Sequence, residues 1–283
     1  MSGGGEAGIQ GGDDVSEAQA GSGEQQEIHP IRWGDCTIGG PRHHFRETFM
    51  VDVLCRHVPS PARVVDVGCG SGSLSRRLMD RGFRLCAFDY SREFITRLNA
   101  VVPPEAAAKF LLFSGSAQAI PLGDDTADAV VCGEVLEHLP DDQAAVREIF
   151  RILVPGGRAL VTVPAFQRLW DDNDEWASHF RRYDPGQLNR IFEAAGFEVE
   201  MVRWWGFPFL HAYHRLIYMP WARRAMRRPS GTGRRTLVGR VGTSALVSRV
   251  LGALFSVERL FSRIPLGIGT MLLARKPAAD SGH

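Results

Sequence analysis

The segment from Val64 to Ser75 constrains the fold of this chain more than any other stretch of its sequence. A short apolar run rich in β-branched residues surrounds Asp66, three glycines follow at every second position, and a helical pattern begins directly after them. This order is typical of a buried strand, a tight turn and the start of a helix. Glycine allows positive φ and close approach of a ligand, and the free N–H groups at the helix start favour a polar or anionic ligand group. The segment therefore predicts a site for a nucleotide-like cofactor.

The spacing of the glycines narrows the class of cofactor. Gly68, Gly70 and Gly72 form G-x-G-x-G, whereas the dinucleotide fingerprint G-x-G-x-x-G would place its third glycine at Ser73. The phosphate loop G-x-x-x-x-G-K-[ST] does not occur in the sequence either. The run Asp-Val-Gly-Cys-Gly-Ser-Gly at 66–72 resembles motif I of the class I S-adenosylmethionine (SAM) methyltransferases.

Further segments resemble motifs of the same family, in the family's order. A second buried strand ends at Asp89, 17 residues after Gly72. Residues 115–122 resemble the segment that edges the adenine, although Ser116 stands where many members carry aspartate. Two longer stretches resemble the fourth-strand motif and the Pro-Gly-Gly turn with its fifth strand, at 128–139 and 151–164. The resemblance covers about residues 60 to 200.

The resemblance implies SAM as the cofactor. Asp89 would accept hydrogen bonds from both ribose hydroxyls, and its alternative role is the N-cap of the next helix, for which Ser91 also qualifies. Arg46 is open to two interpretations, a contact with the SAM carboxylate or a surface position. The full set of expected cofactor residues is Arg46, Asp66, Gly68, Cys69, Gly70, Gly72, Asp89, Tyr90, Ser116, Ala117, Gln118, Gly133 and Glu134.

The alternation of strands and helices over 62–163 predicts a parallel sheet with right-handed crossovers. Helices are expected at about 42–57 and 184–195, with Gly196 as the C-cap of the second. In the family, the strands predicted at 197–205 and 266–275 form an antiparallel pair at one sheet edge. The predicted fold class is α/β: a Rossmann-like, seven-stranded, mostly parallel sheet with helices on both faces and a helical insertion near the C-terminus. The predicted divisions are a disordered acidic, glycine-rich tail (1–28), a SAM-binding core (29–206), a helical cap (207–263), the last core strand (264–276) and a tail (277–283).

Charge is distributed unevenly along the chain, although the net charge is only +1. Residues 1–28 contain six acids and no lysine or arginine, whereas residues 215–276 contain thirteen basic residues and one acid. Three interpretations of the basic stretch are open: a solvated helix face, a nucleic-acid patch, or a contact with anionic lipid or phosphate. Because interleaved aromatic residues are missing, we expect no nucleic-acid partner, and a peripheral membrane or anionic contact through 215–263 stays open.

Apolar residues recur with helical spacing over 244–261, which predicts an amphipathic helix. Neither this stretch nor 207–221 is an uncharged run of about 20 residues, so a membrane-spanning helix is not expected. The five cysteines are scattered without a C-x-x-C pair, and no signal peptide is visible. We expect reduced thiols and a cytoplasmic location.

Methyl transfer from a sulfonium requires an aligned nucleophile and exclusion of water, and it requires a base only when the acceptor must lose a proton. His138 follows the fourth strand, and His179 and Tyr183 lie in a segment that resembles a His-x-Arg-Arg-Tyr pattern of a bacterial subgroup. These three are the candidate catalytic residues, with loop or lid packing as the alternative for each. The three aspartates at 171, 172 and 174 are expected to cap a polar loop, and no metal site is expected.

The segment after the fourth strand limits the class of acceptor. Cys132–Val135 stands where enzymes that methylate nucleobase amino groups show an Asn/Asp-Pro-Pro-aromatic motif, and the double-glutamate loop for protein arginine is missing. The remaining resemblance is to the small-molecule branch, with quinone, lipid, sugar or secondary-metabolite acceptors. Aromatic residues after the later strands predict a largely apolar small-molecule acceptor. The alternative function is a non-catalytic SAM-binding subunit that supports a partner enzyme.

Overall fold

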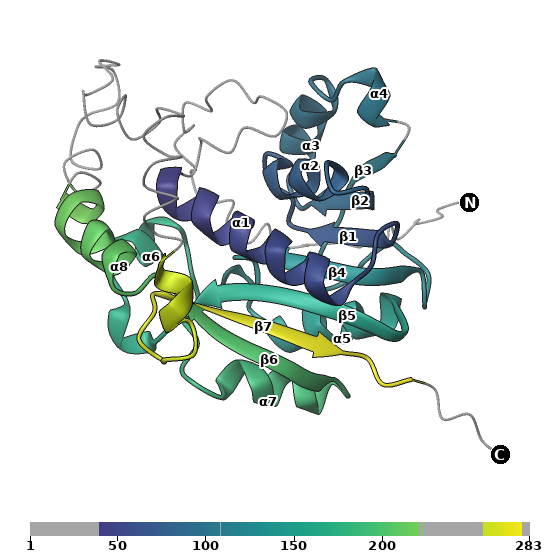
Figure 1. Ribbon diagram of the computed structural model, residues 1–283. Helices are drawn as coiled ribbons and strands as arrows, with labels where there is room; N and C mark the ends of the chain where they lie inside the picture. Colours follow the sequence, from purple (N-terminus) through teal and green to yellow (C-terminus); the bar gives the residue numbers. More distant parts are fainter. Residues whose placement is uncertain (1–39, 108, 221–222, 224–256, 279–283) are drawn as a thin grey trace, which may run out of the picture. The chain divides into compact units, whose positions relative to one another are not determined.

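A seven-stranded sheet in the order β3-β2-β1-β4-β5-β7-β6 organises the chain (Figure 1). The computed structural model describes residues 40–107, 109–220, 223 and 257–278, all within one unit, Ile31–His283. Strands β1 to β5 run parallel, and β7 is antiparallel to both of its neighbours, β5 and β6. The strands are β1 (Arg63–Val67), β2 (Arg84–Asp89), β3 (Phe110–Ser114), β4 (Ala127–Gly133), β5 (Leu153–Pro164), β6 (Glu198–Trp205) and β7 (Gly269–Arg275). The expected α/β fold class and its antiparallel pair at one edge are confirmed.

Helices cover both faces of the sheet (Figure 1). Helices α1, α2 and α3 pack on one face, whereas α5 and α7 pack on the other. The helices are α1 (Gly40–His57), α2 (Ser73–Met79), α3 (Arg92–Asn99), α4 (Pro104–Ala107), α5 (Asp142–Ile152), α6 (Asp172–Trp176), α7 (Gln187–Ala194) and α8 (Phe209–Tyr213). Short helical turns are η1 (Leu136–His138), η2 (Gln167–Leu169), the π-helical η3 (His214–Tyr218) and η4 (Val257–Phe261).

The two layers of core follow from the periodicity of the sequence. Successive side chains of a strand point to opposite faces, so Val64 of β1 joins the cluster under α1 and α2, and Val65 joins the one under α5. Helix α5 places Ala145, Ile149 and Ile152 on its buried face, at the spacing of an amphipathic helix. Each large aliphatic side chain of this kind contributes about 1.5–3 kcal/mol by leaving water.

The strand order fixes where a ligand can bind. Strand β1 lies between β2 and β4, so the crossovers run in opposite directions from this point of the sheet. In open α/β sheets, the crevice outside the carboxyl ends of the strands at such a switch point is the usual ligand site. The carboxyl ends of β1, β2 and β4 therefore lie at this edge, with Gly68 directly after β1, Asp89 as the last residue of β2 and Glu134 directly after β4.

Between β6 and β7 the described residues form α8, η3 and η4. Most of the amphipathic helix predicted at 244–261 lies outside the described residues. Helix α7 ends before Gly196, whose φ of 98° is the left-handed conformation expected after a helix end. Among the described residues, no helix is both long and apolar enough to cross a bilayer.

Candidate functional site

The turn after β1 is an open backbone cradle. Gly68, Gly70 and Gly72 all have positive φ, at 70°, 51° and 72°. A Cβ on Gly68 would collide with the side chain of Val135, whereas a Cβ on Gly70 would have no atom within 4 Å. Gly68 therefore packs closely under the turn, and the backbone of Gly70 borders free space that a ligand can approach.

Asp89 lies beside this cradle at the end of β2. Its Oδ2 accepts a hydrogen bond from the Gly70 N–H at 3.2 Å, and its Oδ1 accepts one from the Ser91 N–H at 3.1 Å. The Ser91 hydroxyl caps helix α3 by accepting from the Phe94 N–H at 3.1 Å. Ser91, not Asp89, is therefore the N-cap, and the Asp89 carboxylate remains at the glycine turn.

Arg46 of α1 and Glu134 at the end of β4 form a second polar group at the same edge. The Arg46 Nη1 lies 3.6 Å from the Glu134 Oε2. The buried Arg46 Nε and Glu134 Oε1 have no hydrogen-bond partner among the described residues. Buried polar atoms are usually paired with protein, water or ligand. The pair therefore has spare capacity for a ligand that carries both an anionic and a cationic group.

Asp66 and Cys69 belong to the interior of the turn. The buried Asp66 carboxylate accepts a hydrogen bond from the Ser75 hydroxyl at 2.6 Å, which ties β1 to the first turn of α2. Burial raises the pKa of Asp66 to about 7, although the bond from Ser75 acts in the opposite direction. Burial also raises the pKa of the Cys69 thiol, so this group is a small packing residue and not a nucleophile.

The remaining expected cofactor residues differ in exposure. Tyr90 is 85% exposed, whereas Ala117 is buried. The Ser116 hydroxyl accepts from the Gln118 N–H at 3.2 Å, and the Gln118 side-chain amide donates to the Asp141 carbonyl at 3.1 Å. Gly133 closes β4, where a Cβ would meet Met50 of α1 at 3.5 Å.

The residues at this edge fit SAM by their chemistry. Asp89 offers a carboxylate for a ribose, the Gly70 backbone leaves room for close approach, and Arg46 with Glu134 complements an amino acid carboxylate and ammonium. When bound, SAM supplies a methyl group on a sulfonium that is already activated for transfer.

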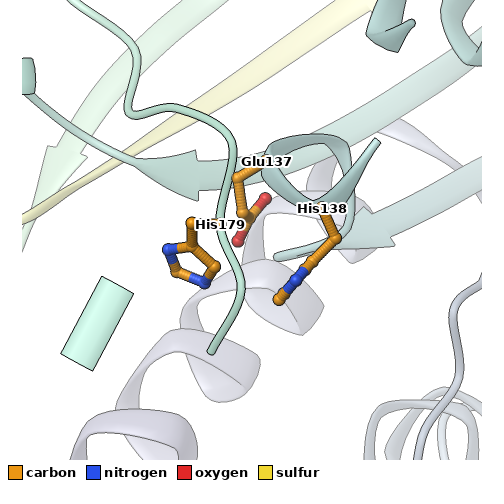
Figure 2. Close-up of side chains that lie close together, drawn as sticks. All are labelled: Glu137, His138 and His179. Atoms are coloured by element: carbon orange, nitrogen blue, oxygen red, sulfur yellow. The ribbon is translucent and has the colours of Figure 1, made fainter. Parts of the chain in front are cut away.

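A second cluster, which we call the Glu–His cluster, consists of Glu137, His138 and His179 (Figure 2). Glu137 and His138 belong to η1 directly after β4, and His179 lies in the loop after α6. One possible ligand atom from each residue lies within 4.8 Å of the other two. The two imidazole rings meet edge to face, with centroids 4.6 Å apart. Two of the three candidate catalytic residues are thus brought together.

Charge and burial give the three members of the cluster different properties. Burial, and then the neighbouring carboxylate of Glu134, raise the pKa of Glu137 well above its ordinary value. Burial and then His179 lower the pKa of His138, so its imidazole is neutral near pH 7. His138 is the exposed member, through which solvent reaches the cluster.

Asp174 fixes the orientation of His179. Its carboxylate lies 2.8 Å from the His179 Nδ1 and accepts from the Arg182 guanidinium at 2.6 Å. Burial alone would raise the pKa of Asp174, but the bonds from His179 and Arg182 outweigh it and hold the pKa at about 2. Asp174 is therefore ionised, and it leaves the second ring nitrogen of His179 for other partners.

Tyr183 occupies a different position from the two histidines. Its side chain is 1% exposed, and its hydroxyl donates to the Asp142 Oδ2 at 2.8 Å. Burial and then this bond raise the pKa of the phenol above its ordinary value. This hydrogen bond ties the loop after β5 to the start of α5, and the Tyr183 hydroxyl therefore already has a partner within the protein.

The three aspartates expected to cap a polar loop lie at the start of α6. Asp171 is the N-cap of α6 and forms a capping box with Asp174, and Asp172 pairs with Arg223 at 2.6 Å.

The aromatic residues after the later strands are divided between core and surface. Phe166 and Trp205 are buried, whereas Trp176 and Phe180 are each 57% exposed.

Sequence reasoning missed Glu137, Asp142 and Asp174 as partners of the candidate residues. Local pattern marks Glu137 only as part of the strand-end motif and Asp174 only as a capping residue. The adjacent pair Glu137–His138 was the available signal, because two potential ligands occur side by side after a strand.

Comparisons with known proteins identify the family of this chain. The family described as "Methyltransferase domain" matches residues 42–202, more than half of the chain. A Mycolicibacterium smegmatis protein named "Probable S-adenosylmethionine-dependent methyltransferase" is 31% identical over 172 residues, which span 59% of this chain and 65% of that protein. The "Ubiquinone biosynthesis O-methyltransferase" of Xanthomonas axonopodis is 28% identical, over 69% of this chain and 82% of that protein. The chain thus spans less than two thirds of the length of the first of these relatives and about four fifths of the second.

Solved structures share the fold at low sequence identity. The Haemonchus contortus phosphoethanolamine N-methyltransferase 2 in complex with SAM has a TM-score of 0.54 and 18% identity, over 81% of this chain and 52% of that one. The [4+2]-cyclase SpnF has a TM-score of 0.58 and 21% identity, over 89% of this chain and 88% of that one. With the family match, the glycine turn and the sheet order taken together, the chain belongs to the class I SAM-dependent methyltransferase family.

Proposed function

We propose that this protein transfers the methyl group of SAM to a small, largely apolar acceptor by direct in-line displacement. The observation that carries the proposal is the open glycine cradle beside Asp89 at the switch point of the sheet. There the chain orients the cofactor, and a nucleophile that approaches opposite the carbon–sulfur bond forms its new bond as that bond breaks. The protein's contribution is alignment and exclusion of water.

The acceptor side of the site is formed by the Glu–His cluster and the loop after β5. An acceptor hydroxyl must lose a proton as it is methylated, and His138 and His179 are the neighbouring groups that can take part in this step. We propose that Tyr183 holds the loop through Asp142 instead of moving a proton, because its hydroxyl is buried and already bonded.

The proposed acceptor is of the quinone, lipid, sugar or secondary-metabolite type. Support comes from relatives named for methylation in ubiquinone biosynthesis and of 2-methyl-6-phytyl-1,4-hydroquinone. Exposed apolar side chains beside the loop, such as Trp176 and Phe180, are suited to contact an acceptor of this kind.

Calorimetric titration with SAM tests the cofactor site. Asp89→Ala should weaken SAM binding by about 1.5–3 kcal/mol, because charge-assisted hydrogen bonds to the ribose are lost. Glu105→Ala, at an exposed position of α4, is the matched control and should bind SAM like the wild type. Unchanged affinity in a folded Asp89→Ala variant would remove Asp89 from the site.

A methyl-transfer assay with labelled SAM and a panel of hydroquinones and phenols tests the activity. His138→Ala and His179→Ala should lower the transfer rate by about 100-fold or more while SAM affinity is retained. Full activity in both variants would show that the Glu–His cluster is not on the acceptor side.

The second candidate function is SAM binding without methyl transfer. The same fold is found in the [4+2]-cyclase SpnF, so the fold alone does not fix the reaction. Formation of S-adenosylhomocysteine with any acceptor in the panel decides for the methyltransferase, because a supporting subunit binds SAM and leaves it intact.

We also propose a peripheral contact with an anionic membrane surface through residues 215–263. Exposed apolar side chains at Leu216, Leu260 and Ile264 lie close in sequence to the exposed Arg215 and Arg263. Apolar anchors among basic residues are the combination that binds anionic lipid surfaces. The absence of a nucleic-acid partner and a cytoplasmic location remain predictions from the sequence.

A further inference from the structure

Glu137 is a buried acid whose carboxylate lacks a partner among the described residues. The residue is 0% exposed, and neither side-chain oxygen accepts a hydrogen bond from any described residue. Figure 2 shows this carboxylate turned toward the space between the imidazoles of His138 and His179. Buried carboxylates are normally hydrogen-bonded, paired with a cation or bound to a metal ion. The cluster therefore calls for a positively charged or proton-donating component.

The two histidines are held in an arrangement that is common among metal-binding histidines. The Nδ1 of His179 is held at 2.8 Å by Asp174, which is itself fixed by Arg182. A carboxylate behind a histidine sets the ring orientation and raises the basicity of the other nitrogen, which is the usual outer arrangement of metal-binding histidines. The ring of His138 lies edge to face against that of His179, with the ring centroids 4.6 Å apart, so both imidazoles are next to the Glu137 carboxylate.

We propose that Glu137, His138 and His179 form a binding site for a first-row divalent cation of the Zn²⁺ class. Two imidazoles and one carboxylate are a donor set that suits such ions, whereas Mg²⁺ and Ca²⁺ prefer oxygen ligands alone. The ligand atoms lie within 4.8 Å of one another, so small side-chain adjustments bring them to one ion. This proposal departs from the expectation of a metal-free centre that came from the sequence.

Three protein ligands leave at least one coordination position open. Because His138 is exposed, this position is accessible to water or to an oxygen of the acceptor. The acceptor would then be one that presents a hydroxyl or carbonyl oxygen. That assignment of the open position rests on the proposed function, whereas binding of the cation itself does not.

The three aspartates of α6 do not form a competing site. Asp171 and Asp174 are engaged in the capping box, Asp174 is bonded to Arg182, and Asp172 pairs with Arg223. Their oxygens already have partners, whereas those of Glu137 have none among the described residues.

Metal binding is tested on the full chain after treatment with a chelator. Zn²⁺ is titrated in competition with a chromophoric zinc indicator, and Co²⁺ is titrated separately and followed by its visible absorption. The expected result is one ion per chain, with Co²⁺ bands of the intensity typical of four- or five-coordinate nitrogen and oxygen ligation. Each variant is also measured by thermal unfolding and by SAM calorimetry.

His138→Ala is the decisive variant, because this exposed side chain can be removed without disturbing the core. It and Glu137→Gln should weaken Zn²⁺ binding by more than about 100-fold, and Asp174→Asn should weaken it by about 10- to 100-fold through the orientation of His179. His57→Ala is the matched control, since this histidine at the end of α1 bonds the Val53 carbonyl away from the cluster. It should bind Zn²⁺ like the wild type.

Absence of stoichiometric Zn²⁺ binding to the wild type would overturn the site, as would equal affinity in His138→Ala. Failure of the proposed function gives a different pattern, namely normal Zn²⁺ binding together with loss of SAM binding or of methyl transfer to the acceptor panel.

Discussion

At the residue scale, the proposed cofactor site depends on whether a Cβ atom would fit at each glycine of the turn. Gly68 has no room for a Cβ because Val135 lies against it, whereas Gly70 has room that the protein itself does not use. Both have positive φ, and side chains are strained in that conformation. Close packing below the turn and free space above it make the turn a cradle.

Gly70→Val is expected to reduce SAM affinity below calorimetric detection, because the side chain would fill the free space beside the turn. Gly156→Val is the matched control. Gly156 also has positive φ, and a Cβ there would have no atom within 4 Å, but it lies in β5 at the Pro-Gly-Gly turn. Comparable thermal destabilisation of both variants, with normal SAM affinity only in Gly156→Val, is the expected outcome; equal affinities would contradict it.

Glu47, a buried acid on α1, should account for part of the loss of folding stability at low pH. Burial by itself raises the pKa of Glu47, but the charge and hydrogen bond of His43 and the hydrogen bond of Ser73 outweigh it, and the pKa is about 2. A folded pKa below the unfolded value stabilises the fold above about pH 4.5, and this stability is lost as the pH falls toward 2. The contribution is on the order of 3 kcal/mol.

Glu47→Gln tests this contribution by chemical unfolding between pH 2 and pH 7. The wild type should lose stability steeply below pH 4.5, and the variant should show a flatter acid limb from a lower plateau. Glu93→Gln is the control, because this exposed acid of α3 pairs with Arg97 at the surface. Parallel curves for wild type and Glu47→Gln would contradict the prediction.

At the element scale, the antiparallel edge of the sheet is fixed by close approach between β6 and β7. The register pairs Trp205 with Gly269, and the indole lies where a Cβ of Gly269 would be. The neighbouring strand β5 also pairs with β7, so any displacement here reaches the centre of the sheet. A large aromatic residue and a glycine thus fit together as one packing unit.

Gly269→Ala should destabilise the protein by about 1–3 kcal/mol, the usual result of overpacking a closely packed contact. Thermal or chemical unfolding measures the difference. Gly123→Ala is the control, because its new methyl group would have only ordinary contact, 3.5 Å from Thr126. Equal stability of both variants would show that the indole can move aside without cost.

At the scale of the whole molecule, basic charge and exposed apolar side chains are concentrated in the part of the chain after β6. Thirteen basic residues and one acid occur over 215–276, against six acids and no basic residue over 1–28. The chain is therefore nearly neutral overall, but its acidic and basic residues are concentrated in different parts of the sequence. This uneven charge favours an oriented encounter with an anionic surface.

The protein should co-sediment with vesicles that contain anionic lipid and not with neutral phosphatidylcholine vesicles. Each basic residue near the surface contributes about 1 kcal/mol, and salt should release the protein. The double variant Arg215→Glu, Arg263→Glu should bind at least about 30-fold more weakly, while Arg97→Glu on α3 serves as the control. Binding that is independent of lipid charge and of salt would contradict a contact of this kind.

The sequence by itself determined most of the helices and strands and the glycine turn after β1. Hydrophobic periodicity and glycine spacing are local, so the helix at 42–57, the alternating strands and the G-x-G-x-G turn could be predicted from neighbouring residues. The seven-stranded sheet with its antiparallel edge followed from the family resemblance and from the rule for right-handed crossovers, and the strand order confirms it.

Only the tertiary structure decided which side chains meet. Glu137 and His138 reach His179 because β4 and β5 are neighbours whose carboxyl ends share one edge, and no local pattern encodes this approach. For the same reason Tyr183, a catalytic candidate by motif, has its hydroxyl bonded to Asp142, 41 residues away along the chain. The periodicity of the sequence indicates which face of a helix or strand a residue occupies. Which residue it contacts on that face depends on how distant elements pack together, and the chemistry of this site depends on those contacts.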